Sequence, residues 1–426
     1  MGPVRDKELM MRSVRFLCVI LCVAATVLAL LAVANGCAKK EEKGIAIWEQ
    51  MDPEEQKLLD VRIAVFQKIH PDVPVTRLHF ETELLRTQFQ TAALSGGGPE
   101  LVFGPSDQIG PFSVMKLIRP LDDVFGAQFF AQFLDGSLDT LNGHIYAVPD
   151  QVGNHLALVY NKKFVKTPPA TSDQFIAFAR KNTVDENRDG VPDRYGLVFN
   201  TTEPFWLVPF LGGFGGWVMD KSYNPTLDSP AMVKALSFVR DLRTKYRVMP
   251  KECDYQQAET LFKEGKASMI INGPWSWGGY IAAGIDVGLT PIPKIAETGL
   301  WPTPMVSSKG YSVNVNCPEK KLPIVKELVD FLISTQNQIE SAQKIKMLPA
   351  GKAAADSLIA KGDPFLEISL AQVKLGRRMP VVPEMRAIWD SMRPSYQNVL
   401  NNEITPEEAA KKMQKAATEA IAKMKE

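Results

Sequence analysis

Residues 267–280 read Ala-Ser-Met-Ile-Ile-Asn-Gly-Pro-Trp-Ser-Trp-Gly-Gly-Tyr and join a short apolar run to a cluster of aromatic rings. The run at 269–271 predicts a buried strand, because it is short, apolar and rich in β-branched side chains. A Gly-Pro pair ends that strand, since proline has no N–H to donate to a β-ladder. Three rings follow, Trp275, Trp277 and Tyr280. They suit either a ligand-binding face or the core, and this stretch alone leaves both interpretations open.

The rest of the chain alternates predicted strands and helices. Early strands are expected at 44–48, 75–80 and 101–103, with a helix that begins at Asp52, because Asp-Pro-Glu-Glu is a typical helix start. Such alternation is typical of a sheet with crossover helices. Further strands are expected at 156–160, 196–199 and 311–315, and helices at 229–245, 254–263, 384–400 and from Thr405.

Composition limits the classes of function. The chain has 426 residues, 45% of them hydrophobic and 23% charged, which is the composition of a globular protein of about two to three domains. Its formal net charge of +1 gives no electrostatic case for nucleic acid as a partner. The four histidines are scattered without the spacing of a zinc site, and no nucleophile-elbow or Walker motif is present.

The N-terminus has the pattern of a targeting segment. Positive residues precede an apolar run at 16–34, and Ala-Asn-Gly-Cys ends at Cys37. This resembles a bacterial lipoprotein signal, with residues 1–36 as the signal peptide and 37–43 as the lipidated Cys37 and a polar linker. The alternative is a retained membrane anchor, since the run is about long enough to span a bilayer. Both interpretations place the body outside the cytoplasm, tethered to a membrane.

Ile-Asn-Gly-Pro-Trp at 271–275 resembles the segment at the sugar cleft of bacterial maltose-binding proteins, the receptors of ABC importers. The resemblance continues in the same order over nearly the whole body. It implies an α/β, two-lobed periplasmic-binding-protein fold of type II, with a ligand cleft between lobes joined by a hinge. It places lobe one at 44–153 and 308–352, and lobe two at 154–307 and 353–426.

The resemblance also implies a set of substrate-binding residues. A pyranose has a C–H face that packs on aromatic rings and a rim of hydroxyls that needs donors and acceptors. Motifs such as Gly-Pro-Glu at 98–100 and Glu-Pro-Phe at 203–205 match those of the family. The residues expected to stack on sugar rings are Trp275, Trp389 and Phe205, and those expected to bond hydroxyls are Asp52, Asp107, Glu203 and Arg393.

The implied function is capture of an oligosaccharide such as maltose or maltodextrin, with no enzymatic activity and no cofactor. A lipid-anchored monomer in the periplasm or on the outer face of the cell membrane would deliver the sugar to an ABC permease. Two positions depart from the family pattern, because its cleft tryptophan is Gly104 here and its cleft lysine is Pro53. Sugar binding is therefore better supported than maltose binding itself.

Two other functions stay open. The same fold could hold a polyol, a sugar phosphate or a peptide, although a phosphate needs converging cations and only Arg393 is available from the motifs. A surface glycosidase could use Glu203 and Asp107 as its two carboxylates. The separation between those carboxylates is what defines such an enzyme, and sequence does not give it.

An acidic segment at 185–193 matches the first half of a calcium-binding loop. The alternative is a tight turn, in which Asp and Asn are common for conformational reasons. Any bound Ca²⁺ is expected to have a structural role. The oxygen ligands would come from Asp185, Asn187, Asp189 and Asp193.

Two cysteines, Cys253 and Cys317, lie in the body of the chain. The resemblance places them in different lobes, where a bridge between them would restrain closure. We therefore predict that both are free thiols or paired only weakly.

Overall fold

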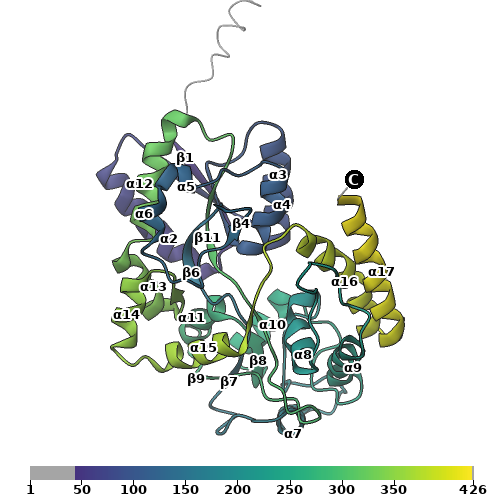
Figure 1. Ribbon diagram of the computed structural model, residues 1–426. Helices are drawn as coiled ribbons and strands as arrows, with labels where there is room; N and C mark the ends of the chain where they lie inside the picture. Colours follow the sequence, from purple (N-terminus) through teal and green to yellow (C-terminus); the bar gives the residue numbers. More distant parts are fainter. Residues whose placement is uncertain (1–43, 425–426) are drawn as a thin grey trace, which may run out of the picture. The chain divides into compact units, whose positions relative to one another are not determined.

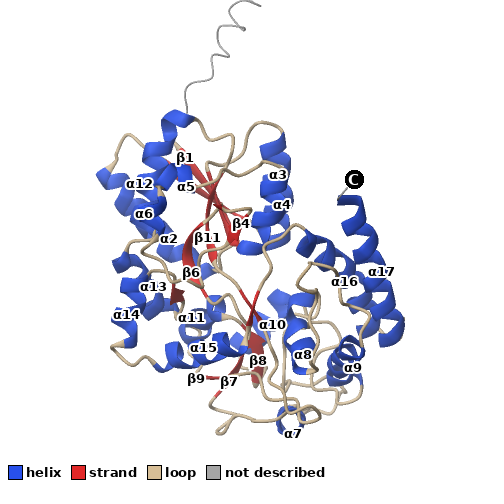
Figure 2. Cartoon of the chain, in the orientation of Figure 1, coloured by secondary structure: helices blue, strands red, loops and turns tan. Residues whose placement is uncertain are grey.

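The computed structural model describes residues 44–424. The expected signal peptide, Cys37 and the polar linker lie outside the described residues. The described chain forms two principal β-sheets, whose strands are flanked by helices (Figure 2). Within this part of the chain, none of the helices has the length and hydropathy that a membrane span requires.

The larger sheet has six strands in the order β12-β6-β11-β3-β1-β2. β1 pairs in parallel with both β2 and β3, whereas β11 runs antiparallel to its neighbours β3 and β6. A strand from the second half of the chain therefore fills the middle of a sheet that the first half begins. In spatial order, the strands span Leu348–Pro349, Val148–Val152, Lys309–Val313, Leu101–Pro105, Ile45–Glu49 and Val75–His79.

Helices cover both faces of this sheet (Figure 1). Ile47 and Phe103 belong to one buried cluster, whereas Val102 belongs to another, against which the partly buried Trp48 packs. Adjacent residues divide in this way because successive side chains of a strand point to opposite faces. The first cluster includes side chains of α2 (Pro53–Ile69) and α12 (Leu322–Leu332), and the second includes those of α3 (Thr82–Leu94) and α4 (Ile109–Val114).

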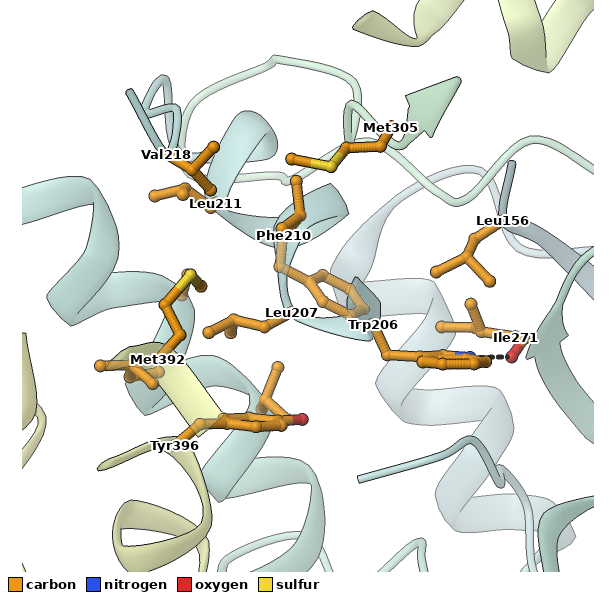
Figure 3. Packing of buried hydrophobic residues seen from close by; sticks show 14 of the residues in the cluster. Leu156, Trp206, Leu207, Phe210, Leu211, Val218, Ile271, Met305, Met392 and Tyr396 are labelled. Carbon is orange, nitrogen blue, oxygen red and sulfur yellow. Dashed lines mark hydrogen bonds between the residues drawn. The ribbon is translucent and has the colours of Figure 1, made fainter. Parts of the chain in front are cut away.

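The smaller sheet has three strands in the order β8-β7-β9, at Met269–Asn272, Ala157–Asn161 and Val287–Thr290. Met269 and Ile271 face the largest buried cluster, part of which Figure 3 shows. Ile270 faces the opposite side, together with Trp277 and Tyr280, which are both 0% exposed. These two rings are therefore core residues.

Three helices of the structure agree with the predicted helices at 229–245, 254–263 and 384–400 to within one residue at each end. Two short strand pairs complete the sheets, β4 (Thr140–Leu141) with β5 (His144–Ile145), and β10 (Met305–Val306) with β13 (Arg377–Arg378). The other helices are α5 (Asp122–Phe125), α6 (Ala127–Phe130), α7 (Ser172–Asn182), α8 (Val208–Gly213), α9 (Pro230–Thr244), α10 (Tyr255–Lys263), α11 (Pro274–Ala282), α13 (Thr335–Ile345), α14 (Lys352–Ile359), α15 (Pro364–Leu375), α16 (Glu384–Leu400) and α17 (Pro406–Met424), with 3-10 turns at Ser106–Gln108, Pro204–Trp206 and Glu319–Lys321.

The expected strand at 196–199 is wrong. This segment runs beside β8 and makes only isolated bridges, such as Val198 with Ile270. The N–H of Leu197 donates to the carbonyl of Val248 at 3.1 Å and that of Gly196 to Thr183 Oγ1 at 3.0 Å, so neither joins a ladder with β8. Gly196 also lies directly against the main chain of α7, where any side chain would clash with the carbonyl of Ala179.

Two passages of the chain between the sheets are bonded to each other. Asn154, between β6 and β7, donates from its main-chain N–H to Ser307 O at 2.9 Å and from its side chain to Ser307 Oγ at 3.0 Å.

Cys253 and Cys317 are free and buried, which confirms that they are not bridged in this structure. The lobe boundaries stay a prediction, and α14, assigned to lobe two, packs on α13 and β12.

Candidate ligand-binding site

A cavity of about 500 Å³ lies where several strands give way to helices. This volume falls within the roughly 300–1,000 Å³ of typical small-molecule sites. Its lining includes residues within three positions of the carboxyl ends of β1, β3 and β8, and ligands of α/β proteins commonly bind beyond the carboxyl ends of strands. The structure brings all seven predicted residues to this one cavity: Asp52, Asp107, Glu203, Phe205, Trp275, Trp389 and Arg393.

The three predicted stacking rings reach the cavity from separate elements. Trp275 stands in the first turn of α11, immediately after the Gly-Pro pair that ends β8, and its Nε1 donates to Tyr255 Oη at 3.1 Å. Phe205 is in the 3-10 turn Pro204–Trp206, and its ring lies edge-on to Trp389 of α16 with centroids 6.4 Å apart. Trp389 is fixed by the core on one side while it lines the cavity.

Trp206, next to Phe205, shows how this wall is anchored. Its Nε1 donates to the carbonyl of Ile271 at 2.9 Å (Figure 3). The same ring packs with Leu156 and Leu207 in the largest buried cluster. The 3-10 turn is therefore tied to β8, which also leads into Trp275.

Asp52 is held by two hydroxyls from other elements. Its Oδ2 accepts from Tyr255 Oη at 2.8 Å and from Ser276 Oγ at 3.0 Å. Burial, together with the nearby carboxylates Glu259 and Glu55, raises the pKa of Asp52 to about 7. Asp52 thus joins the end of β1 to α10 and α11, in addition to its place as the N-cap of α2.

Asp107 follows β3 and lines another part of the cavity wall. Burial raises its pKa to about 6, and the Arg86 guanidinium opposes that shift. Asp107 Oδ1 has no hydrogen-bond partner among residues 44–424. A buried carboxylate oxygen without a partner is costly when the group is ionised, which agrees with the raised pKa of Asp107.

Glu203 and Arg393 form a two-pronged ion pair at one side of the cavity. Arg393 Nε donates to Glu203 Oε1, and Nη2 to Oε2, both at 2.9 Å. Burial raises the pKa of Glu203, and Arg393 opposes the shift. Glu83 of α3 lies 3.5 Å from Arg393 and 2.8 Å from Arg386, so this corner also links α3 to α16.

Several cavity residues were missed by sequence reasoning. Tyr255 follows the N-cap of α10 directly, so a polar ring at a helix start was the available signal. Lys309 is the one charged residue in the strand Lys309–Val313, whose residues are all buried. Arg86 and Lys263 lie on otherwise ordinary helices, where no sequence signal separates a cavity residue from an exposed one.

The acidic loop at 185–193 directs its oxygens to its own backbone. Asp185 accepts from the N–H of Gly190 at 3.0 Å, and Asp189 accepts from that of Val191 at 2.8 Å. Asn187 and Asp193 likewise accept main-chain N–H groups of the loop. Across residues 44–424, no cluster of three or more His, Cys, Asp or Glu side chains is placed to hold a metal ion. Calcium binding stays a prediction, which titration of the melting temperature with Ca²⁺ would test.

A family model described as bacterial extracellular solute-binding protein matches residues 62–367. Among curated relatives, the maltotriose-binding protein of Pyrococcus abyssi (strain GE5 / Orsay) is 26% identical over 84% of this chain and 78% of its own length. The galactooligosaccharide-binding protein of Bacillus subtilis (strain 168) is 27% identical over 88% of this chain and 89% of its own.

Solved structures show the same likeness. A maltose/maltodextrin-binding domain from Bdellovibrio bacteriovorus, bound to maltotriose, is 45% identical and superposes with a TM-score of 0.87 over 89% of this chain and 100% of that one. The maltotriose-binding protein of Thermus thermophilus, also with maltotriose bound, is 25% identical with a TM-score of 0.81 over 88% and 100% of the two chains. This agreement confirms the two-lobed, type II periplasmic-binding fold.

Proposed function

The chain belongs to the bacterial extracellular solute-binding proteins, and from this membership we propose that it binds a neutral oligosaccharide of the maltodextrin type for an ABC importer. One observation carries the proposal: three aromatic rings and four fixed polar side chains meet in a single cavity. The relative named for maltotriose and the two solved structures with maltotriose bound support the same class of ligand.

The charge of the cavity supports a neutral ligand. Seven carboxylates and four lysine or arginine side chains line it. An anionic ligand such as a sugar phosphate would meet this excess of acid, and no set of converging cations offsets it. Hydroxyls, in contrast, can both donate to carboxylates and accept from cations.

Each residue has a proposed role. Trp275, Trp389 and Phe205 stack on pyranose faces, and the Asp107 carboxylate accepts hydroxyl hydrogens. Glu203 and Arg393 present a rigid pair in which the carboxylate accepts and the guanidinium donates. Asp52 contributes a carboxylate that Tyr255 and Ser276 hold in place through Oδ2.

Calorimetric titration of the parent and Trp275→Ala with maltotriose tests the proposal. Loss of the ring removes a stacking contact worth about 0.5–1.5 kcal/mol beyond its buried area, so affinity should fall roughly tenfold or more. Trp301→Ala is the matched control, because Trp301 is a half-buried tryptophan that does not line the cavity. The proposal fails if the parent binds no neutral oligosaccharide, or if Trp275→Ala binds as tightly as the control.

We further propose that the protein is a lipid-anchored monomer outside the cytoplasm, attached through Cys37, and that it delivers its ligand intact to permease subunits. A Cys37→Ala variant of the full chain should then leave the membrane fraction. The rival function, a glycosidase that uses Glu203 and Asp107, predicts shortened products. Chromatography of maltotriose after long incubation would distinguish the two, because a receptor returns the sugar unchanged.

A further inference from the structure

Lys309 is a buried cation that lines the cavity. It begins β11, directly after the passage of chain that is bonded to Asn154, and its exposed fraction is only 4%. Lysine is almost never buried to this degree without a close partner, because removing an ammonium from water is costly. The contacts of its ammonium group therefore bear on what the cavity holds.

Those contacts are poor in hydrogen bonds. Among residues 44–424, the one acceptor within hydrogen-bond distance of Lys309 Nζ is Glu55 Oε1, at 3.4 Å. That distance exceeds the ~2.7–3.2 Å of ordinary N–H···O bonds. The same Glu55 oxygen accepts from Gln151 at 2.9 Å, and the other accepts from the N–H of Asp52 at 2.9 Å. An ammonium group has three donors, so most of this capacity is unused.

The positive charge of Lys309 is balanced by nearby carboxylates, even though little of its hydrogen-bonding capacity is used. Glu55 lies beside it, and its positive charge opposes the raised pKa values of Asp52 and Asp150. Since carboxylates already surround the ammonium, a further anion is not what it lacks. The missing partner is a neutral oxygen that can accept a short hydrogen bond.

The aromatic rings near Lys309 indicate where such an acceptor oxygen would lie. Lys309 Nζ lies 6.0 Å from the ring centroid of Trp275 and 5.7 Å from that of Phe103. A pyranose stacked on Trp275 would carry its hydroxyl rim near the ammonium. Resting on the proposed function, we propose that Lys309 is a further ligand-binding residue that donates a hydrogen bond to a hydroxyl of the sugar stacked on Trp275.

Calorimetric titration with maltotriose tests this inference with a set of charge-matched variants. Lys309→Met removes the donors and keeps the length of the side chain, while Glu55→Gln with Lys309→Met also removes the charge left behind on Glu55. A lost hydrogen bond to a charged group should weaken binding by about tenfold to a hundredfold in both. Lys346→Met is the control, because Lys346 is a half-buried lysine that pairs with Asp363 at 3.1 Å and does not line the cavity, and it should stay within about threefold of the parent.

Glu55→Gln alone separates the ion pair from the ligand contact, since it keeps the ammonium, and affinity within about threefold of the parent is expected. The inference is overturned if the double variant, folded by circular dichroism, binds maltotriose within threefold of the parent while Trp275→Ala does not. In that case the proposed function stands. If the parent itself binds no neutral oligosaccharide, both fall.

Discussion

Replacing Asp52 by asparagine is expected to stabilise the protein, and increasingly so at higher pH. In the folded protein, burial, Glu259 and Glu55 raise the pKa of Asp52 from 3.8 to about 7. Between these two values the folded state holds a proton that the unfolded chain has released. The contribution of Asp52 to stability therefore falls as the pH rises from about 4 to about 7.

The size of the effect follows from the two pKa values. Between about pH 5 and pH 8, ionisation lowers the free energy of the unfolded chain by ~4 kcal/mol and that of the folded protein by ~1.4 kcal/mol, at ~1.36 kcal/mol per unit. The asparagine side chain of the Asp52→Asn variant does not ionise, and its amide oxygen can still accept from Tyr255 and Ser276. The stability difference between variant and parent should thus grow by about 2–3 kcal/mol over this range.

Urea unfolding of parent and variant at about pH 5 and pH 8 measures this difference directly. Asp123→Asn, which removes an exposed carboxylate on α5, controls for the loss of one negative charge. A difference between Asp52→Asn and the parent that stays constant or shrinks with rising pH would refute the reasoning. It would mean that the hydroxyls of Tyr255 and Ser276 hold Asp52 ionised in spite of its burial.

Three further predictions concern packing, closure and thiols. Trp206→Phe leaves a buried carbonyl of β8 without its 2.9 Å donor and should cost about 1–3 kcal/mol in urea unfolding, so an unchanged midpoint would count against it. Glu83→Gln removes ion pairs to two arginines of α16 and should weaken maltotriose binding up to about fivefold, an effect expected to fade in high salt and contradicted if it persists there. Denatured, unreduced protein that starts after Cys37 should titrate with two thiols, Cys253 and Cys317, and a count of zero would show a bridge.

Local patterns were sufficient to predict most of the fold. The helix at 384–400 and the capped start at Asp52 were predicted correctly because periodicity and capping chemistry act within a few residues. The prediction of a strand at 196–199 was wrong because the hydrogen bonding of this segment depends on its contact with the end of α7. Gly196 gives its N–H to Thr183, a choice that no pattern within the segment reveals.

The candidate site shows the same limit. Trp275 and Trp277 are two residues apart and chemically identical, yet one lines the cavity and the other is fully buried. The turn of α11 decides between them, since residues two apart on a helix face different directions. The partnership of Asp52 with Tyr255 joins residues 203 positions apart, so only the assembled fold could show it.

The late position of β11 in the sequence has a consequence for how the chain acquires its structure. β11 lies between β3 and β6, and both of these strands precede it by well over a hundred residues. A chain that enters its folding compartment N-terminus first therefore presents two open strand edges until Lys309–Val313 arrives. Such a sheet has high contact order and is expected to fold slowly, so a long-lived intermediate with those edges free is the natural substrate for a chaperone.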